Sequence, residues 1–171
     1  MAGPRSFHRH GYRFIHGNHI LAVHQHAGDG VGCRPVSDIL HRHHFPDSNV
    51  TLHEKMKQVF ALIADHEESV AAPFVEFLRS KKGVRLIGRQ TAAQESRAPT
   101  FSFTVSGRKA EEIPAALEPF KVAIGSGDFY AARCIRALGL EAQGGVVRAS
   151  MVHYSSAADV TRLIEGLDQV I

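Results

Sequence analysis

The composition of this chain changes abruptly near residue 50, and this change constrains the fold more than any other feature. The first 50 residues contain nine of the twelve histidines but neither lysine nor glutamate, which first appear at Glu54 and Lys55. Apolar residues before residue 50 form only short runs, without the period of a helix or of a strand. We therefore predict an irregular His-rich segment over residues 1–50, not an independent domain, and a folded domain over residues 51–171.

Regular signals for secondary structure begin at residue 51. Thr51 and Glu54 have the spacing of a capping box, and apolar residues then recur at three- and four-residue steps. This pattern predicts a long amphipathic helix through Leu78, kinked at Pro73. The short apolar run 84–87 and the alternating run 99–105 are typical of strands.

The rest of the chain continues to alternate between helix and strand patterns. In order, we predict a helix over 111–117, a short strand over 121–124, a glycine-containing loop over 125–129, a helix over 130–138 that ends at Gly139, a strand from Val146, and a last helix capped by Ser156 and Asp159. The predicted fold is α/β (α+β), with a small mixed sheet covered by helices.

Composition excludes several classes of function. The net charge is +3, and the basic residues form no stripe interleaved with aromatic residues, so we expect no nucleic-acid partner. No apolar run approaches the roughly 20 residues that a membrane span requires, so we expect no membrane insertion. The two cysteines, Cys33 and Cys134, have no metal-binding or disulfide-framework spacing. Their small number favours a reducing, cytoplasmic location.

Arg148 is an unusual residue in the strand that begins at Val146. A guanidinium remains charged and loses favourable hydration on burial, so it needs an anionic or bidentate partner. That partner is either a ligand or a local acid such as Asp128. Alternatively, the side chain reaches solvent at the edge of the strand.

The residues around Arg148 carry a family resemblance. The stretch GGVVRASMVHYSSAADVTRLIEGLDQV (144–170) resembles the C-terminal end of class V aminotransferases and cysteine desulfurases, which are fold-type I enzymes that depend on pyridoxal phosphate. Four further segments occur in the expected order: ADHE (64–67), KGVRLIG (82–88), TFSFTV (100–105) and GDFYA (127–131). The resemblance covers about residues 51–171 and implies the small C-terminal domain of such an enzyme.

The resemblance implies roles for four residues. Arg148 stands where the family binds the α-carboxylate of an amino-acid substrate, and this arginine is the predicted substrate clamp. Asp128 and Tyr130 could orient the substrate or a neighbouring phosphate, and Tyr154 could line the site; for the two tyrosines, simple packing is the alternative. Tyr130 stands where desulfurases carry a reactive cysteine, and no catalytic residue is assigned in this chain.

The resemblance also implies pyridoxal phosphate as cofactor. Its chemistry needs a lysine for the covalent bond and an aspartate beside the ring nitrogen. In the family these residues lie in a large domain, N-terminal to the segments matched here. The six lysines of this chain fall on predicted helices, helix ends or a strand start. We therefore expect a truncated form that is inactive alone, and a homodimer in the complete enzyme.

Two other interpretations remain open for the chain. A small domain without its partner domain would expose an apolar face and could serve as a non-catalytic binding module. The pairs His8/His10, His24/His26 and His41/His43 would each share one face of a strand, which suggests a metal-binding protein. Without a rigid scaffold we expect no metal site, and residues 1–50 could also arise from an out-of-frame start.

Overall fold

A computed structural model of the chain describes residues 13–14, 33–46 and 49–171. The helices and strands, in chain order, are β1 (Arg13–Phe14), α2 (Cys33–His44), α3 (Leu52–Ser80), β2 (Val84–Ile87), β3 (Thr100–Val105), α4 (Glu112–Ala116), the 3-10 helix η3 (Glu118–Phe120), β4 (Val122–Ala123), β5 (Gly125–Gly127), α5 (Ala132–Ala137), β6 (Val146–Ser150) and α6 (Ala157–Val170). The predicted α/β class is confirmed.

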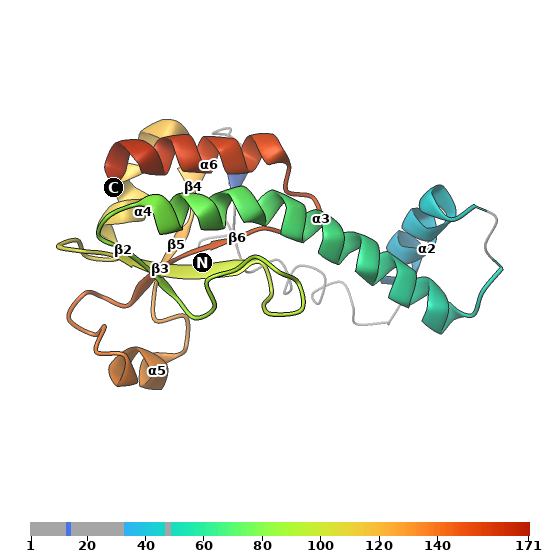
Figure 1. The fold of residues 1–171 in the computed structure, drawn as a ribbon, viewed down its shortest axis with the longest axis horizontal. Helices are drawn as coiled ribbons and strands as arrows, with labels where there is room; N and C mark the ends of the chain where they lie inside the picture. The colour runs from blue at the N-terminus through green and yellow to red at the C-terminus, as the bar shows by residue number, and fades with distance from the viewer. Residues whose placement is uncertain (1–12, 15–32, 47–48) are drawn as a thin grey trace, which may run out of the picture.

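The main sheet has the strand order β2-β3-β6-β5, and every neighbouring pair is antiparallel. The parallel pairing is between β1 and β4, in a separate two-stranded sheet. Helices α3 and α6 lie side by side on one face of the main sheet, and α5 lies on the opposite side (Figure 1). The fold therefore has two helices over one face and a short helix near the other.

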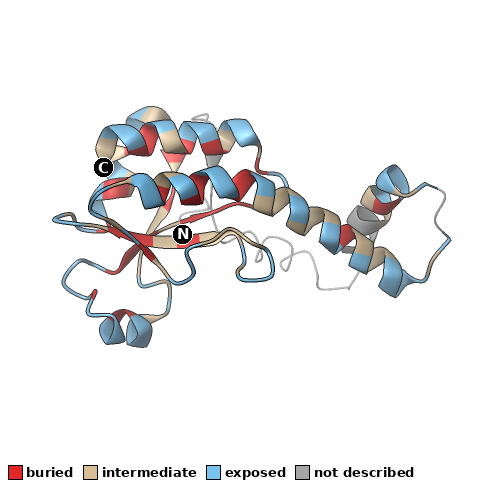
Figure 2. Cartoon of the chain, in the orientation of Figure 1, coloured by how far each residue is buried: buried red, intermediate tan, exposed pale blue. Residues whose placement is uncertain are grey.

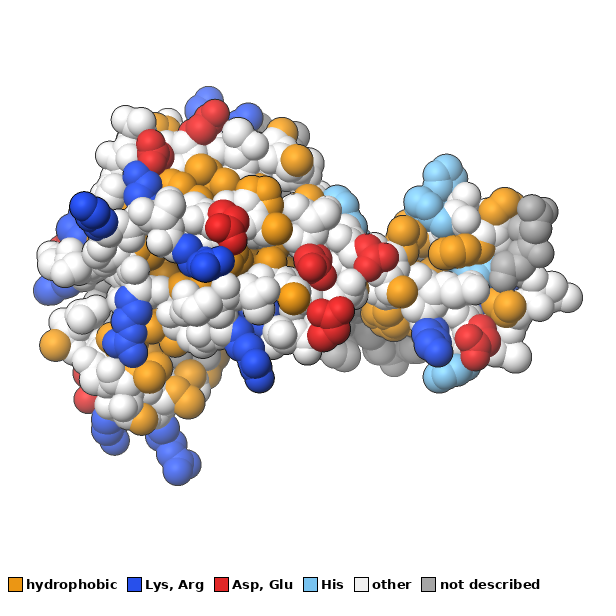
Figure 3. Space-filling model, viewed as in Figure 1, with side chains coloured by type: hydrophobic (Ala, Val, Ile, Leu, Met, Phe, Trp, Pro, Cys, Tyr) orange, Lys and Arg blue, Asp and Glu red, His pale blue; other side chains and the backbone are white. Residues whose placement is uncertain are grey.

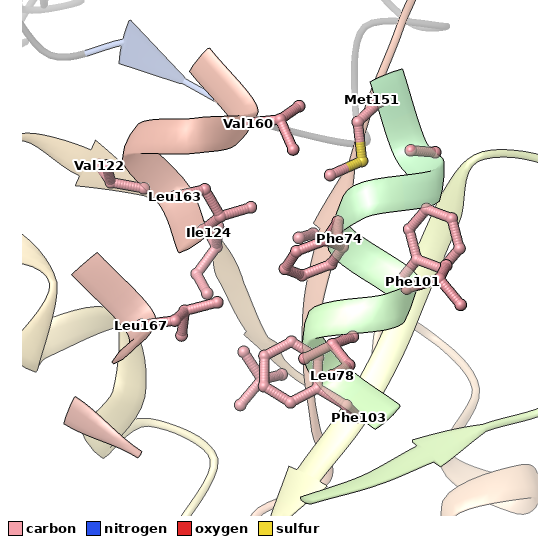
Figure 4. Close-up of a cluster of buried hydrophobic side chains, with 14 of the residues drawn as sticks. Phe74, Leu78, Phe101, Phe103, Val122, Ile124, Met151, Val160, Leu163 and Leu167 are labelled. Atoms are coloured by element: carbon pink, nitrogen blue, oxygen red, sulfur yellow. The ribbon is translucent and has the colours of Figure 1, made fainter. Parts of the chain in front are cut away.

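The main core lies between the sheet and the two long helices. Phe74 of α3 packs between Phe101 and Phe103 of β3, with ring centroids 5.7 and 6.3 Å apart and nearly perpendicular rings. Leu163 and Leu167 of α6 close this cluster (Figure 4). All five side chains are fully buried, so the pattern of apolar residues in α6 and the second half of α3 is explained by one shared core.

The ends of the long helices follow their sequence signals. The Ser156 hydroxyl accepts a hydrogen bond from the Asp159 backbone, and the Asp159 carboxylate accepts one from the Ser156 backbone, which completes a capping box. Thr51 caps α3 through the Glu54 backbone N–H. Helix α3 continues through Pro73.

The first half of α3 extends beyond the main core. Figure 2 shows buried residues concentrated in the second half of α3, whereas the first half is largely intermediate or exposed. Leu52 and Phe60, which belong to the apolar pattern of the helix, are 45% and 59% exposed. Hydrophobic side chains are accordingly visible on the surface of this end of the molecule (Figure 3).

Helix α2 lies within the segment for which the sequence predicted irregular structure. It packs against the first half of α3, and the buried ring of His41 donates a hydrogen bond from Nε2 to Gln58 Oε1 over 2.7 Å. Its last turn is rich in basic residues, which suits the negative end of a helix dipole. Part of the His-rich segment is thus helical, through a contact with α3 that no local pattern revealed.

The glycine-containing segment that the sequence predicted as a loop is an edge strand. Residues Gly125–Gly127 form β5, which pairs with β6. Glycine and serine have low strand propensity, so the pairing depends on the neighbouring strand and not on local preference. Within the described part of the chain, no helix is both long enough and apolar enough to cross a membrane.

Candidate functional site

Arg148 lies on the face of the main sheet that is opposite to α3 and α6. Its neighbours in the strand, Val147 and Ala149, are buried in the main core, and successive side chains of a strand point to opposite faces. Across the sheet, Arg148 is paired with Ser102 on one side and Gly125 on the other. Because Gly125 has no side chain, strand β5 itself places no side chain directly beside Arg148.

The guanidinium of Arg148 stacks on an aromatic ring. Its Cζ atom lies 3.6 Å from the centroid of the Phe129 ring. The side chain is half-buried, and this burial lowers the pKa of Arg148. Stacking uses the flat face of the guanidinium and leaves the N–H groups around its edge able to bind a planar anion.

Among the described residues, no carboxylate forms an ion pair with Arg148. The local acid considered from the sequence, Asp128, has a different partner: its Oδ1 accepts a hydrogen bond from the backbone N–H of Tyr130 over 3.1 Å. Arg148 is therefore a half-buried cation held by an aromatic face, with no protein anion to neutralise it in the part of the chain described.

The loop after β5 has an unusual backbone. Phe129 and Tyr130 both have positive φ, at 51° and 64°, a conformation that non-glycine residues seldom adopt. The Asp128 side chain and the hydrogen bond from Ala131 N–H to the Asp128 carbonyl, 2.8 Å long, hold this turn. The turn places the Phe129 ring over Arg148 and leaves Tyr130 fully exposed.

A close backbone contact fixes the position of this loop. A Cβ atom added to Gly145, just before β6, would come within 2.3 Å of the Gly127 carbonyl oxygen. Beyond this contact, Ile135, Leu140 and Val146 form a second small core, with Phe129 packed against it. The aromatic ring that stacks on Arg148 is thus anchored to the body of the domain.

The structure brings Arg148 to the loop that carries Asp128 and Tyr130, but the contact is made by Phe129. Sequence reasoning named the residues on either side of Phe129 and missed it. The strand register could not have revealed it, because Gly127 pairs with Val146 and the chain beyond it leads away from Arg148. The turn with positive φ at Phe129 and Tyr130 brings the ring back over the guanidinium.

Tyr154 lies in the turn that follows β6, and it is 53% exposed. Its ring makes an edge-on contact with His153, with centroids 5.0 Å apart, and partial desolvation raises the pKa of Tyr154. This turn contacts α3, because His66 Nε2 donates a hydrogen bond to the Ser155 carbonyl over 2.9 Å. Tyr154 and the loop of Asp128 are therefore held by different elements.

Cys134 is not part of either hydrophobic core. It is exposed on α5, where Ile135 is the residue that enters the second small core. Helix α5 is short and buries only one side against the sheet, so the adjacent residue takes the inward position.

Of the three histidine pairs considered for metal binding, the pair within the described residues, His41/His43, does not have strand geometry. His41 and His43 lie on helix α2, where residues two apart point in different directions, and His41 is bonded to Gln58. His8/His10 and His24/His26 lie outside the described residues. Within the described ranges, no group of three or more histidine, cysteine or acidic residues could hold a metal ion.

The lysines lie away from the elements that carry Arg148 and Phe129. None of the six is on β5, β6 or the loop between β5 and α5. Lys55 pairs with Asp38 at 4.0 Å, and Lys81 pairs with Asp168. The other four lysines, Lys57, Lys82, Lys109 and Lys121, are exposed. These surroundings do not fit a lysine that carries pyridoxal phosphate, which needs an enclosed site beside the substrate.

Solved structures show where this fold occurs. A cysteine desulfurase of Thermococcus onnurineus NA1 matches 70% of this chain and 28% of its own length, with a TM-score of 0.59 and 22% identity. A cysteine desulfurase of Escherichia coli matches 62% of the chain and 24% of its own length, with a TM-score of 0.52 and 20% identity. The chain therefore has the fold of one part of these proteins.

Sequence comparison gives the family. An aminotransferase-like protein of Gibberella zeae is 33% identical over 119 residues, 69% of this chain and 30% of that protein. A probable cysteine desulfurase of Mycobacterium leprae is 34% identical over 102 residues, 60% of this chain and 23% of that protein. The chain thus spans less than a third of the length of either relative. The model of the family described as aminotransferase class-V matches residues 50–163, so this chain belongs to the class-V aminotransferase family.

Proposed function

We propose that residues 51–171 form the small domain of a pyridoxal-phosphate-dependent enzyme that acts on an amino acid, and that Arg148 binds the α-carboxylate of the substrate. One observation carries this proposal. Arg148 is half-buried and stacked on Phe129, and no acid among the described residues pairs with it. A half-buried cation has lost part of its hydration, and a bound carboxylate would replace it with two parallel hydrogen bonds.

The surrounding sheet supports a carboxylate as the partner. Ser102, directly across from Arg148, is a short residue with a hydroxyl group, and Gly125 on the other side adds no side chain. The strand pairs around Arg148 therefore contain one cation and no acid. Asp128 and Tyr130 are proposed as further substrate contacts at the neighbouring loop, and Tyr154 at the turn after β6.

The cofactor is proposed to be bound outside these residues. The lysines of this chain do not fit the covalent site, so no reaction step is assigned to them. A large domain that supplies the lysine, and a homodimeric assembly, are parts of the proposal that the family suggests. In this arrangement the chain contributes substrate recognition, and we expect no turnover from it alone.

The proposal is tested in an enzyme completed by a large domain. Arg148→Ala should raise KM for the amino acid about 10- to 150-fold, which corresponds to losing a charge-assisted pair of about 1.5–3 kcal/mol. Affinity for pyridoxal phosphate should change little, because a carboxylate clamp does not hold the cofactor. Arg148→Lys should rescue only part of the loss, since an ammonium group cannot form two parallel bonds.

Arg162→Ala is the matched control, because Arg162 is an exposed arginine on α6. It should leave both constants unchanged. Equal losses of amino-acid and cofactor affinity in Arg148→Ala would contradict the assignment, since they would indicate a general defect of the domain.

A further inference from the structure

The turn that carries Tyr154 is held by two consecutive residues of α3. His66 donates a hydrogen bond from Nε2 to the carbonyl oxygen of Ser155, at 2.9 Å. The carboxylate of Glu67 accepts a hydrogen bond from the backbone N–H of His153. These two contacts involve the residues immediately before and after Tyr154, so they fix the backbone on both sides of it.

The turn is also closed by its own hydrogen bonds. The backbone N–H of Val152 donates to Ser155 Oγ at 3.0 Å, and the backbone N–H of Ser155 donates to the Val152 carbonyl at 2.7 Å. Ser155 is buried, whereas Tyr154 is half exposed. The side chain of Tyr154 therefore projects from a turn whose backbone cannot move without breaking several bonds.

We infer that His66 and Glu67 are positioning residues for Tyr154, the exposed side chain of the turn after β6. The inference rests on the proposed function only for the role of Tyr154 as a substrate contact. The ring N–H of His66 binds the carbonyl of Ser155, and the carboxylate of Glu67 binds the N–H of His153, two residues earlier. Moving the backbone of the turn, which sets the position from which Tyr154 projects, requires breaking these bonds.

The position of His66 and Glu67 along α3 explains why they can hold the turn. The second half of α3 is locked into the main core through Phe74 and Leu78, whereas its first half extends away from the sheet (Figure 1). His66 and Glu67 stand between these two parts. The turn after β6 is therefore tied to a rigid point of the helix.

The test uses the full 171-residue chain with Tyr12→Phe and Tyr130→Phe, which leaves Tyr154 as its single tyrosine. Titration of tyrosinate absorbance then reports the surroundings of Tyr154 alone. His66→Leu and Glu67→Ala remove the donor and the acceptor, and the midpoint should fall toward that of free tyrosine as Tyr154 becomes more solvated. His66→Gln and Glu67→Gln keep a donor and an acceptor, and the midpoint should remain that of the parent.

Amide hydrogen exchange gives a second measurement for the same variants. Glu67→Ala should speed exchange of the His153 amide about tenfold or more, whereas Glu67→Gln should preserve its protection. If His66→Leu fails to fold, the Glu67 pair decides the question. Unchanged titration and exchange in folded Glu67→Ala would overturn the inference, and so would equal losses in the Gln and Ala variants.

The inference and the proposed function can fail separately. Carboxylate binding is detected at the guanidinium of Arg148 when an anion is added, whereas the positioning role is detected at Tyr154 and His153. Loss of that binding would refute the substrate clamp and leave the Tyr154 titration as it was. Loss of the Tyr154 response with intact binding at Arg148 would refute only the positioning role.

Discussion

The guanidinium carbon of Arg148 lies 3.6 Å from the centre of the Phe129 ring, with the arginine on strand β6 and the ring on the loop that follows the neighbouring strand β5. This contact holds the arginine flat and keeps its N–H edge available. Phe129→Ala should therefore weaken carboxylate binding by about 0.5–2 kcal/mol, the worth of a cation–π contact at a partly desolvated site. Phe129→Tyr keeps an aromatic face and should bind as the parent does. Equal affinities for the Ala and Tyr variants would show that stacking has no role.

Gly145 lies so close to the Gly127 carbonyl that a methyl group added at Gly145 should strongly destabilise the domain. Gly145→Ala would place Cβ within 2.3 Å of the Gly127 carbonyl oxygen at a residue with φ of 93°. We expect the free energy of unfolding to fall by about 2–4 kcal/mol, from overpacking and backbone strain together.

Gly144→Ala is the matched control for Gly145→Ala. Gly144 also has positive φ, at 75°, but nothing lies within 4 Å of an added Cβ. Gly144→Ala should lower the free energy of unfolding by only about 1–2 kcal/mol, which is the cost of positive φ for a residue with a side chain. Urea unfolding of both variants measures the difference, and equal losses would show that the contact with Gly127 is not the cause.

The two halves of α3 should respond differently to the same substitution. Phe74→Ala removes a fully buried ring from the main core and should cost about 3–5 kcal/mol of unfolding free energy. Phe60→Ala removes a ring that is 59% exposed on the same helix and should cost less than about 1 kcal/mol. Thermal and urea unfolding give both values. Comparable losses would mean that the first half of α3 is covered in solution.

The turn after β6 should make stability depend on pH. His153 is an exposed residue, but partial desolvation of its ring and the neighbouring charge of His66 lower its pKa from the ordinary 6.5. A lowered pKa means that the folded state prefers the neutral ring. This contribution is fully present above pH 6.5 and is lost as the pH falls below it, because the unfolded chain binds the proton first.

Glu67 acts in the opposite direction. Burial raises its pKa from 4.5, despite the opposing effects of His66 and of the His153 N–H, so the folded state is disfavoured as the pH rises above 4.5. Urea unfolding at about pH 7.5 and about pH 5.5 spans the range in which the histidine contribution is lost, and His153→Gln removes that contribution alone. His153→Gln should lose less stability between these two conditions than the parent. An identical loss in both proteins would contradict the assignment to His153.

Local signals predicted some elements of this fold correctly. Strand β2 occupies the predicted residues 84–87, and α6 begins at the capping box of Ser156 and Asp159. Both elements are determined by residues close in the sequence: a short apolar run for β2, and the Ser156 hydroxyl and Asp159 carboxylate for the start of α6. Gly139 also has the positive φ that its position at the end of α5 suggested.

The features that sequence reasoning missed depend on distant partners. Strand β5 forms because β6 offers it a pairing edge, although glycine and serine do not favour strands. The helix α2 is supported by the contact of His41 with Gln58. Phe129 became part of the candidate site only through the turn after β5, which brings its ring over Arg148, nineteen positions away in the sequence.

The most direct test of the central claim is nuclear magnetic resonance of the chain itself, with the Nε–Hε signal of Arg148 observed as acetate or L-alanine is added. We predict a saturable shift of this signal, with a dissociation constant on the order of millimolar for a single charge-assisted pair at a half-buried guanidinium. Signals of Arg136 and Arg162, both exposed, should not move in the same way. An Arg148 signal that follows those two, with no saturation, would contradict the claim that Arg148 is a carboxylate-binding residue.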